Sequence, residues 1–128
     1  MNPSFGIRGL GTDLVEVERF RLALGRRAQL SARLFTDGER AYAAGQHDPV
    51  PSLAARFGAK EAVMKALATG LGAFAFRDVE VVRTESGAPE LALHGGAAAL
   101  AEQRGVRAWQ VSLSHTDATA MAVVLALG

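Results

Sequence analysis

The middle of the chain, residues 53–68, constrains the fold more than any other segment. It is rich in alanine and larger apolar residues, lacks proline, and is followed by Gly70 and Gly72. Apolar residues at helical spacing that are closed by glycine are typical of a helix and its C-terminal end. The sequence therefore predicts one long helix here, against which other segments pack.

The remaining segments predict a mixture of shorter helices and antiparallel strands. Residues 5–13 are expected to form a strand that contains several glycines, including Gly9 and Gly11. Such glycines let a ligand or another backbone come close. Further helices are expected over residues 14–24, 31–35, 39–45 and 97–104, further strands over residues 78–83, 90–94, 109–114 and 118–127, and a loop over residues 46–52.

Length and composition favour one α+β domain that covers residues 1–128. The chain is 49% hydrophobic and 21% charged, and neither an internal repeat nor a long linker divides it. A chain of this size can bury a core of its own. We expect a small antiparallel sheet packed against the long helix.

Composition also excludes several classes of protein. A formal net charge of +1 is too small to indicate nucleic-acid or membrane binding by itself. The absence of cysteine excludes disulfides, thiolate catalysis and zinc–thiolate sites, and fits a reducing cytoplasm. No signal peptide is visible, and the longest apolar run, residues 120–127, is far shorter than the roughly 20 residues that a membrane helix needs. We therefore expect a soluble, cytoplasmic protein.

One carboxylate of the long helix lies on an apolar stripe. Phe57, Glu61, Met64 and Ala68 recur at helical spacing, so burial of the apolar members draws Glu61 toward the interior or the rim of a cleft. A buried carboxylate has to be protonated, paired or bound to a cation. Lys65, one turn further on, is the nearest partner, so a helix-surface Glu61–Lys65 pair is an alternative to a functional role.

A second carboxylate, Asp13, lies where the glycine-rich strand gives way to the next helix. Aspartate is a good N-cap, which is one interpretation of this position. The other is a magnesium ligand, because magnesium prefers one or two carboxylates together with substrate phosphates. Asp13 and Glu61 together would supply such a site, provided that the fold brings them near each other.

A basic stretch follows the first strand. Residues 19–33 contain five arginines and no acidic residue: Arg19, Arg21, Arg26, Arg27 and Arg33. A solvated helix face is the simplest explanation. Nucleic acid, an anionic membrane or an acidic protein would also use such a patch. Aromatic residues are sparse here, and Phe20 and Phe35 fit core positions better than a base-stacking platform.

Three segments together resemble a known enzyme family. They are GLGTDL at residues 9–14 with Glu16 and Arg19, RFGAKEAVMKAL at residues 56–67 with Thr69 and Gly70, and VSLSHT at residues 111–116. Their order and spacing resemble those of the small bacterial type of 4′-phosphopantetheinyl transferase, the holo-[acyl-carrier-protein] synthase family. The resemblance spans nearly the whole chain, and the middle segment is its most specific part.

The resemblance implies a reaction and a set of site residues. Such enzymes use Mg²⁺ to move the phosphopantetheine arm of coenzyme A onto a serine of an apo acyl carrier protein, releasing 3′,5′-ADP. Asp13 and Glu61 are thereby implied to hold magnesium, and Lys65 to contact phosphate. The same resemblance implies a homotrimer with active sites at subunit boundaries. The residues implied near the nucleotide end of coenzyme A are Arg56, Gly87, Pro89, Ser114, His115 and Thr116.

The resemblance also gives the basic stretch a partner. Arg19, Arg26 and Arg33 are implied to contact an acidic carrier protein, rather than nucleic acid or a membrane.

Two positions depart from the family pattern. Gly58 stands where alanine is common, at a helix cost of about 0.5–1 kcal/mol. Ala88 stands in the turn where a lysine is often found, which weakens a phosphate contact there.

The sequence leaves alternatives for the catalytic base and for the carrier protein that is modified. A metal-bound water positioned by Glu61 is the preferred base, with Glu61 itself and His115 as alternatives. Fatty-acid biosynthesis is the expected pathway, with carrier domains of polyketide or peptide synthases as alternatives. Rival interpretations are another magnesium-dependent nucleotide or diphosphate enzyme, a non-catalytic nucleic-acid-binding module, and a structural trimer without chemistry.

Overall fold

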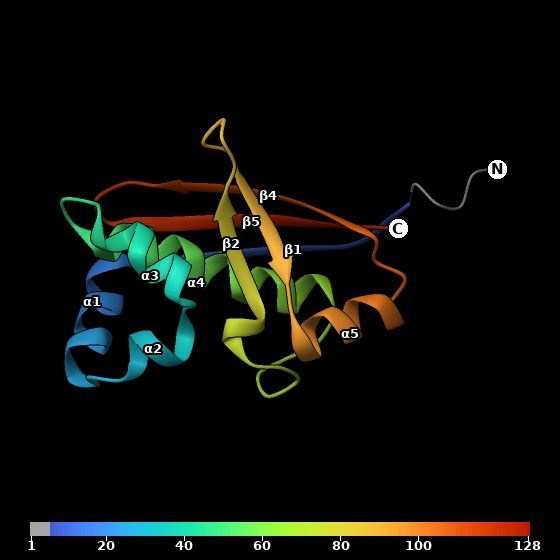
Figure 1. The fold of residues 1–128 in the computed structure, drawn as a ribbon, viewed down its shortest axis with the longest axis horizontal. Coiled ribbons are helices and arrows are strands. Elements are labelled where there is room, and N and C mark those ends of the chain that lie inside the picture. Colours follow the sequence, from blue (N-terminus) through green and yellow to red (C-terminus); the bar gives the residue numbers. More distant parts are fainter. Residues whose placement is uncertain (1–5) are drawn as a thin grey trace.

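The computed structural model describes residues 6–128, which form two antiparallel sheets and several helices around one long helix (Figure 1). The three-stranded sheet has the order β1-β5-β4, and β2 and β3 form a separate hairpin. In chain order the elements are β1 (Ile7–Glu16), α1 (Val17–Arg26), α2 (Leu30–Leu34), α3 (Asp37–Ala44), α4 (Pro49–Ala66), η2 (Phe76–Asp78), β2 (Val79–Arg83), β3 (Pro89–Leu93), α5 (Gly95–Gln103), β4 (Ala108–His115) and β5 (Thr119–Leu127).

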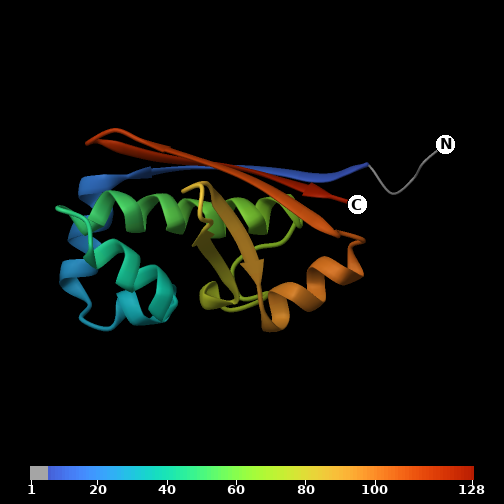
Figure 2. The same cartoon turned by 45° about the horizontal axis from the view of Figure 1, so that its top comes forward.

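The long helix α4 lies between two layers. Figure 2 shows the three-stranded sheet along one side of α4, and the shorter helices with the hairpin along the other. Because both sides are covered, α4 is buried nearly all round, and Ala54, Ala59 and Val63 are fully inaccessible. Burial thus extends well beyond the predicted stripe. Neither α4 nor any other helix of residues 6–128 has the length and hydropathy needed to cross a bilayer.

Two glycines of β1 allow α4 to pack directly against the strand. A Cβ atom built on Gly9 would overlap the backbone carbonyl of Ala66, and one built on Gly11 would overlap that of Ala62. The close approach of a backbone at these glycines, predicted from the sequence, is therefore confirmed. It fixes the position of β1 along α4, which matters because both elements carry candidate site residues.

The start of α4 corrects one sequence prediction. Residues 46–52 were expected to be a loop, but the helix begins at Pro49. Proline is tolerated at the first position of a helix, where its missing N–H has no helical partner. Asp48 caps this end, since the Val50 N–H donates to its Oδ1 at 3.1 Å. At the other end the helix stops at Ala66, and Ala68 has a φ of +53°.

The boundary between β1 and α1 corrects a second prediction. The helix was expected to start at Leu14, but the strand continues to Glu16 and α1 begins at Val17. Asp13 is therefore a strand residue paired with Ala122 of β5, and the N-cap interpretation of Asp13 is wrong. The beginning of the expected strand at residue 5 lies outside the described residues. The remaining expected helices and strands are found within about two residues of their predicted bounds.

A buried ion pair joins α4 to α3 and the hairpin. The Lys60 Nζ donates to Glu39 Oε1 at 2.8 Å and to the carbonyls of Phe76 and Val79, and both charged side chains are fully buried. Glu39 also accepts from the Thr36 N–H, completing a capping box, and from the Val81 N–H. The pair thus has hydrogen-bond partners on both members.

Candidate active site

Two predicted metal ligands share one groove at the edge of α4. Asp13 is on β1, and Glu61 is on α4. Asp13 alternates with the exposed Leu14 and so lies on the side of the strand that faces the helix. The groove measures about 450 Å³ and is also lined by Arg19 and by the aromatic ring of Phe57. The fold therefore brings Asp13 and Glu61 together, which sequence spacing alone was unable to show.

Lys65 reaches across to β1. Its Nζ donates to the Thr12 carbonyl at 2.8 Å and to Asp13 Oδ1 at 3.2 Å, while 54% of its side chain stays exposed. Within residues 6–128 no ion pair joins Lys65 to Glu61, so the alternative of a simple Glu61–Lys65 surface pair is wrong. Lys65 of α4 is instead linked to β1 through Thr12 and Asp13.

The charge of this groove is incompletely balanced. Burial and the neighbouring Asp13 carboxylate raise the pKa of Glu61, and Lys65 offsets this rise only in part. Glu16 and Arg19 add one charge of each sign to the lining, so Asp13 and Glu61 share the one ammonium of Lys65, which already donates to Asp13. A cation between Asp13 and Glu61 would remove the remaining repulsion between these carboxylates.

The donor set fits a hard divalent cation. Over residues 6–128, no group of three or more His, Cys, Asp or Glu side chains clusters as metal ligands would, which disfavours a fully protein-ligated zinc or calcium site there. Magnesium takes one or two carboxylates and completes its shell with water and substrate phosphates. Asp13 and Glu61 therefore suit magnesium in the presence of a phosphate-bearing substrate.

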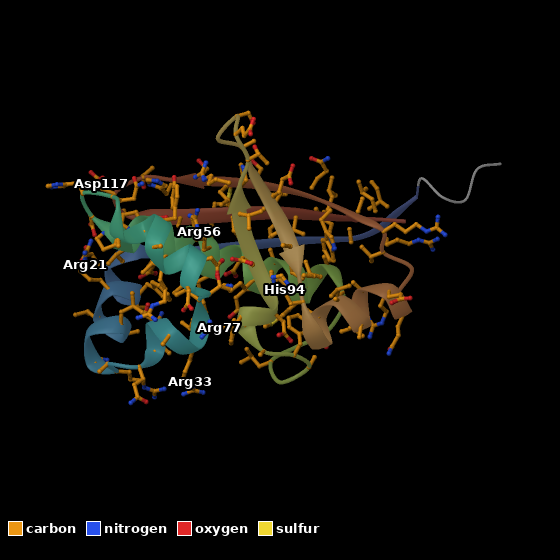
Figure 3. The ribbon with its side chains drawn as sticks, viewed as in Figure 1. Arg21, Arg33, Arg56, Arg77, His94 and Asp117 are labelled. Carbon is orange, nitrogen blue, oxygen red and sulfur yellow. The ribbon has the colours of Figure 1, made fainter. Side chains whose placement is uncertain are left out.

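A second pocket gathers other predicted site residues. It measures about 260 Å³, and its lining includes Arg56, Ser114 and His115 together with Tyr42 and Arg83. Arg56 is only 1% exposed, and its guanidinium carbon lies 4.3 Å from the centre of the Tyr42 ring. Figure 3 shows Arg56 beside α3 and α4. Burial lowers the pKa of Arg56, and the nearby Arg83 lowers it further.

Three other predicted residues lie in or next to turns, outside the groove and the second pocket. Thr116 closes the β4–β5 turn, where its Oγ1 accepts from the Ala118 and Thr119 N–H groups. Gly87, with a φ of +85°, forms the tip of the hairpin, and Pro89 begins β3. Within one chain these residues therefore do not meet Asp13 and Glu61.

The arginines of the basic stretch differ in whether they make ion pairs within the chain. Arg21 makes a two-pronged ion pair with Asp48 at 3.0 and 2.6 Å and a further bond to Glu18, so its charge is used within the chain. Arg19 lines the Asp13–Glu61 groove. Arg26 ends α1, and Arg33 lies on α2, where Figure 3 shows it at the side of the molecule away from the sheet.

Two residues of the second pocket were missed by sequence reasoning. Tyr42 comes from α3 and Arg83 from the end of β2, and the Tyr42 ring and the Arg83 guanidinium meet only in the folded chain. Arg83 is the only basic residue of the hairpin, which was the one signal available in the sequence.

Known proteins of one family resemble this chain in sequence and in fold. Residues 9–124 match the model of the 4′-phosphopantetheinyl transferase superfamily. The holo-[acyl-carrier-protein] synthase of Streptomyces griseus is 48% identical over 122 residues, which cover 95% of this chain and 99% of that one. The structure of holo-[acyl-carrier-protein] synthase from Neisseria meningitidis has a TM-score of 0.86 at 32% identity, covering 94% of this chain and 98% of that one. The Bacillus anthracis enzyme, solved in complex with CoA (3′,5′-ADP), has a TM-score of 0.79 at 30% identity, covering 95% and 97%.

Proposed function

Because the chain belongs to the 4′-phosphopantetheinyl transferase superfamily, we propose that it moves the phosphopantetheine arm of coenzyme A to a serine of an apo acyl carrier protein. The serine Oγ attacks the β-phosphorus, a new P–O bond forms, and the bond to the departing 3′,5′-ADP breaks. The observation that carries this proposal is the meeting of Asp13 and Glu61 in one groove, with Lys65 donating to Asp13.

In this proposal the groove holds the diphosphate. Asp13 and Glu61 would hold magnesium, which when bound neutralises phosphate charge and aligns the diphosphate for in-line attack. The exposed ammonium of Lys65 is free to turn from Thr12 toward phosphate oxygens, where it offsets developing negative charge. Glu61, rather than His115, lies in the groove with Asp13, so we assign Glu61 to positioning the group that accepts the serine proton.

The second pocket would hold the nucleotide end of coenzyme A. Arg56 and His115 supply donors for phosphate, and Ser114 adds a hydroxyl at the same wall. The hairpin turn with Gly87 and Pro89 and the β4–β5 turn with Thr116 remain expected contacts from the family resemblance. The complex of the Bacillus anthracis relative with CoA supports coenzyme A as the donor.

We further propose that the active site is completed by a homotrimer. The groove and the second pocket have no lining residue in common, so one chain presents two separate parts of a site. Figure 2 shows the outer face of the three-stranded sheet without a covering layer. The β1 and β5 part of that face exposes apolar side chains, with Leu10 59%, Leu14 69% and Met121 40% exposed, as expected of a surface that packs against further copies.

Met121→Lys tests the trimer, because it places a charge on the outer face of the sheet. We expect light scattering to give a smaller mass than for the wild type and transferase activity to fall with it. Leu71→Lys is a matched control, since Leu71 is 73% exposed in the loop after α4. A Met121→Lys protein that keeps both its mass and its activity would contradict the proposed interface.

The carrier protein is proposed to bind at the arginines of α1 and α2. Arg19, Arg26 and Arg33 are exposed, and an acidic carrier would be attracted by their charge. Activity should then decrease as ionic strength rises. A location in the cytoplasm and a role in fatty-acid biosynthesis are part of this proposal, and they rest on the proposed substrates.

The decisive experiment uses the protein, coenzyme A, magnesium and an apo acyl carrier protein, with the carrier weighed by mass spectrometry. We expect the carrier to gain one phosphopantetheine. The gain should disappear with EDTA and return with added magnesium. Failure to modify any carrier, together with failure to bind coenzyme A, would overturn the proposed function.

A further inference from the structure

Two arginines of the second pocket lie against the same aromatic ring. The guanidinium carbons of Arg56 and Arg83 lie 4.3 and 5.1 Å from the centre of the Tyr42 ring, within the range of cation–π attraction. Arg83 is also held from the hairpin side, because its Nη1 donates to the Gly87 carbonyl at 2.5 Å. Tyr42 and Gly87 thus fix the direction of an otherwise exposed side chain.

No carboxylate of residues 6–128 faces this pair of arginines from within the second pocket. None of the described residues that line the pocket is acidic. Glu80 lines an adjoining cavity with both arginines, but it binds Thr36 and His94. Glu39 binds Lys60. The pocket therefore has two cations and no anion of its own.

The hydrogen bonds of Arg56 are also incomplete. One Nη donates to Ser52 Oγ at 2.7 Å, whereas the Nε is buried and has no partner. A buried unpaired donor is costly, and a bound acceptor removes that cost. The two guanidinium charges and the absence of a carboxylate in the described lining favour an anionic ligand in this pocket.

We propose that Arg83, positioned by Tyr42, is a second anion-binding residue beside Arg56, and that the two guanidiniums bind the 3′-phosphate monoester of coenzyme A. This inference rests on the proposed function and adds a specificity residue to it. A phosphate monoester carries more charge than a diester and leaves three oxygens free, which suits two guanidiniums.

The test compares the binding of 3′,5′-ADP and 5′-AMP to wild type and Arg83→Gln by calorimetry. Glutamine keeps a donor for the Gly87 carbonyl but removes the charge. We expect 3′,5′-ADP to bind roughly 10- to 100-fold more weakly, with 5′-AMP almost unchanged. Arg83→Lys should recover part of the affinity. In the transferase assay, Arg83→Gln should raise KM for coenzyme A more than it lowers kcat.

Tyr42 needs a separate readout because it acts through Arg83. Tyr42→Phe retains the ring and should keep the discrimination between the two nucleotides, whereas Tyr42→Leu should lose part of it. Arg77→Gln is the matched control, since Arg77 is half-exposed and binds the Ala32 carbonyl and Asp37 instead. This control should bind both nucleotides like the wild type.

Each outcome separates this inference from the proposed function. If the wild type modifies the carrier and Arg83→Gln still prefers 3′,5′-ADP as strongly, the inference is wrong and the function stands. Equal weakening for both nucleotides would show a structural role for Arg83 and would also overturn the inference. A wild type that neither modifies a carrier nor binds 3′,5′-ADP would overturn both.

Discussion

Two lysines of α4, Lys60 and Lys65, show how one residue type serves the fold at one place and the site at another. Lys60 faces α3 and the hairpin, is fully buried, and donates to Glu39 and to two backbone carbonyls. Lys65 faces β1, is half-exposed, and donates to Thr12 and Asp13. The first has no hydrogen-bonding capacity left for a ligand, whereas the second does.

The carboxylates beside the two lysines differ in the same way. Glu39 accepts hydrogen bonds from Lys60 and from two backbone N–H groups, so its charge is fully solvated by the protein. Glu61 has a pKa raised by burial and by Asp13. A satisfied buried pair indicates a structural role, and an unbalanced pair of carboxylates at a groove indicates a ligand.

Lys60→Met gives the largest expected effect on this comparison. It leaves Glu39 charged and buried without its cation, which costs about 3–5 kcal/mol of the free energy of unfolding. Urea denaturation measures this loss. Activity should disappear only to the extent that the protein is unfolded, because Lys60 touches neither cavity.

A double variant, Lys60→Met with Glu39→Gln, removes both charges and keeps an amide oxygen for one of the two backbone donors. It should recover part of the lost stability. If the single variant were as stable as the wild type, the buried pair would have no structural role and the contrast between the two lysines would fail.

Glu61→Gln gives the next largest effect, and on activity instead of stability. Loss of one metal-binding carboxylate should lower kcat/KM by about 10²–10³-fold, which corresponds to about 3–4 kcal/mol. In EDTA the variant should be at least as stable as the wild type, since the repulsion from Asp13 is gone. Paired activity and denaturation measurements decide this, and a strongly destabilised variant would place Glu61 with Glu39 among the structural residues.

The contrast also shows what a single sequence can predict. The stripe of α4 and the glycines of β1 identified Glu61 and a close backbone approach. The position of Asp13 relative to Glu61 depends on how β1 packs along α4, and that packing is set by Gly9 and Gly11 against helix carbonyls. The site pair was therefore a hypothesis until the fold was seen.

The buried Lys60–Glu39 pair and the Tyr42–Arg83 contact of the second pocket were not predicted, for a different reason. Lys60 lies in an apolar helix, but its partner Glu39 comes from α3. Tyr42 and Arg83 likewise come from separate elements. Contacts between distant segments depend on tertiary packing, which local periodicity does not predict. The family resemblance supplied site roles, but none for these four residues.

Lys65→Met should have a smaller effect than Glu61→Gln. Removal of one charged donor to phosphate should lower kcat/KM by about 10- to 50-fold. The free energy of unfolding should change by less than about 1 kcal/mol, because the Lys65–Asp13 pair is partly exposed. Lys65→Arg is the matched control for charge. A loss of stability as large as that of Lys60→Met would show that the two lysines are equivalent.

Gly58→Ala gives the smallest effect and tests the helix that carries both lysines. A Cβ at this position would lie 3.5 Å from a methyl group of Val15 and 3.6 Å from the Ala122 Cβ, which are ordinary contact distances. We therefore expect a gain of about 0.5–1 kcal/mol in stability from the better helix former, measured by urea denaturation. The nearest atoms to the new methyl belong to Val15 and Ala122 and not to Asp13, Glu61 or the buried pair, so activity should stay unchanged. A destabilised variant would show that α4 packs against β1 and β5 too tightly to accept one methyl group, and the positions of Lys60 and Lys65 would then depend on Gly58 as they do on Gly9 and Gly11.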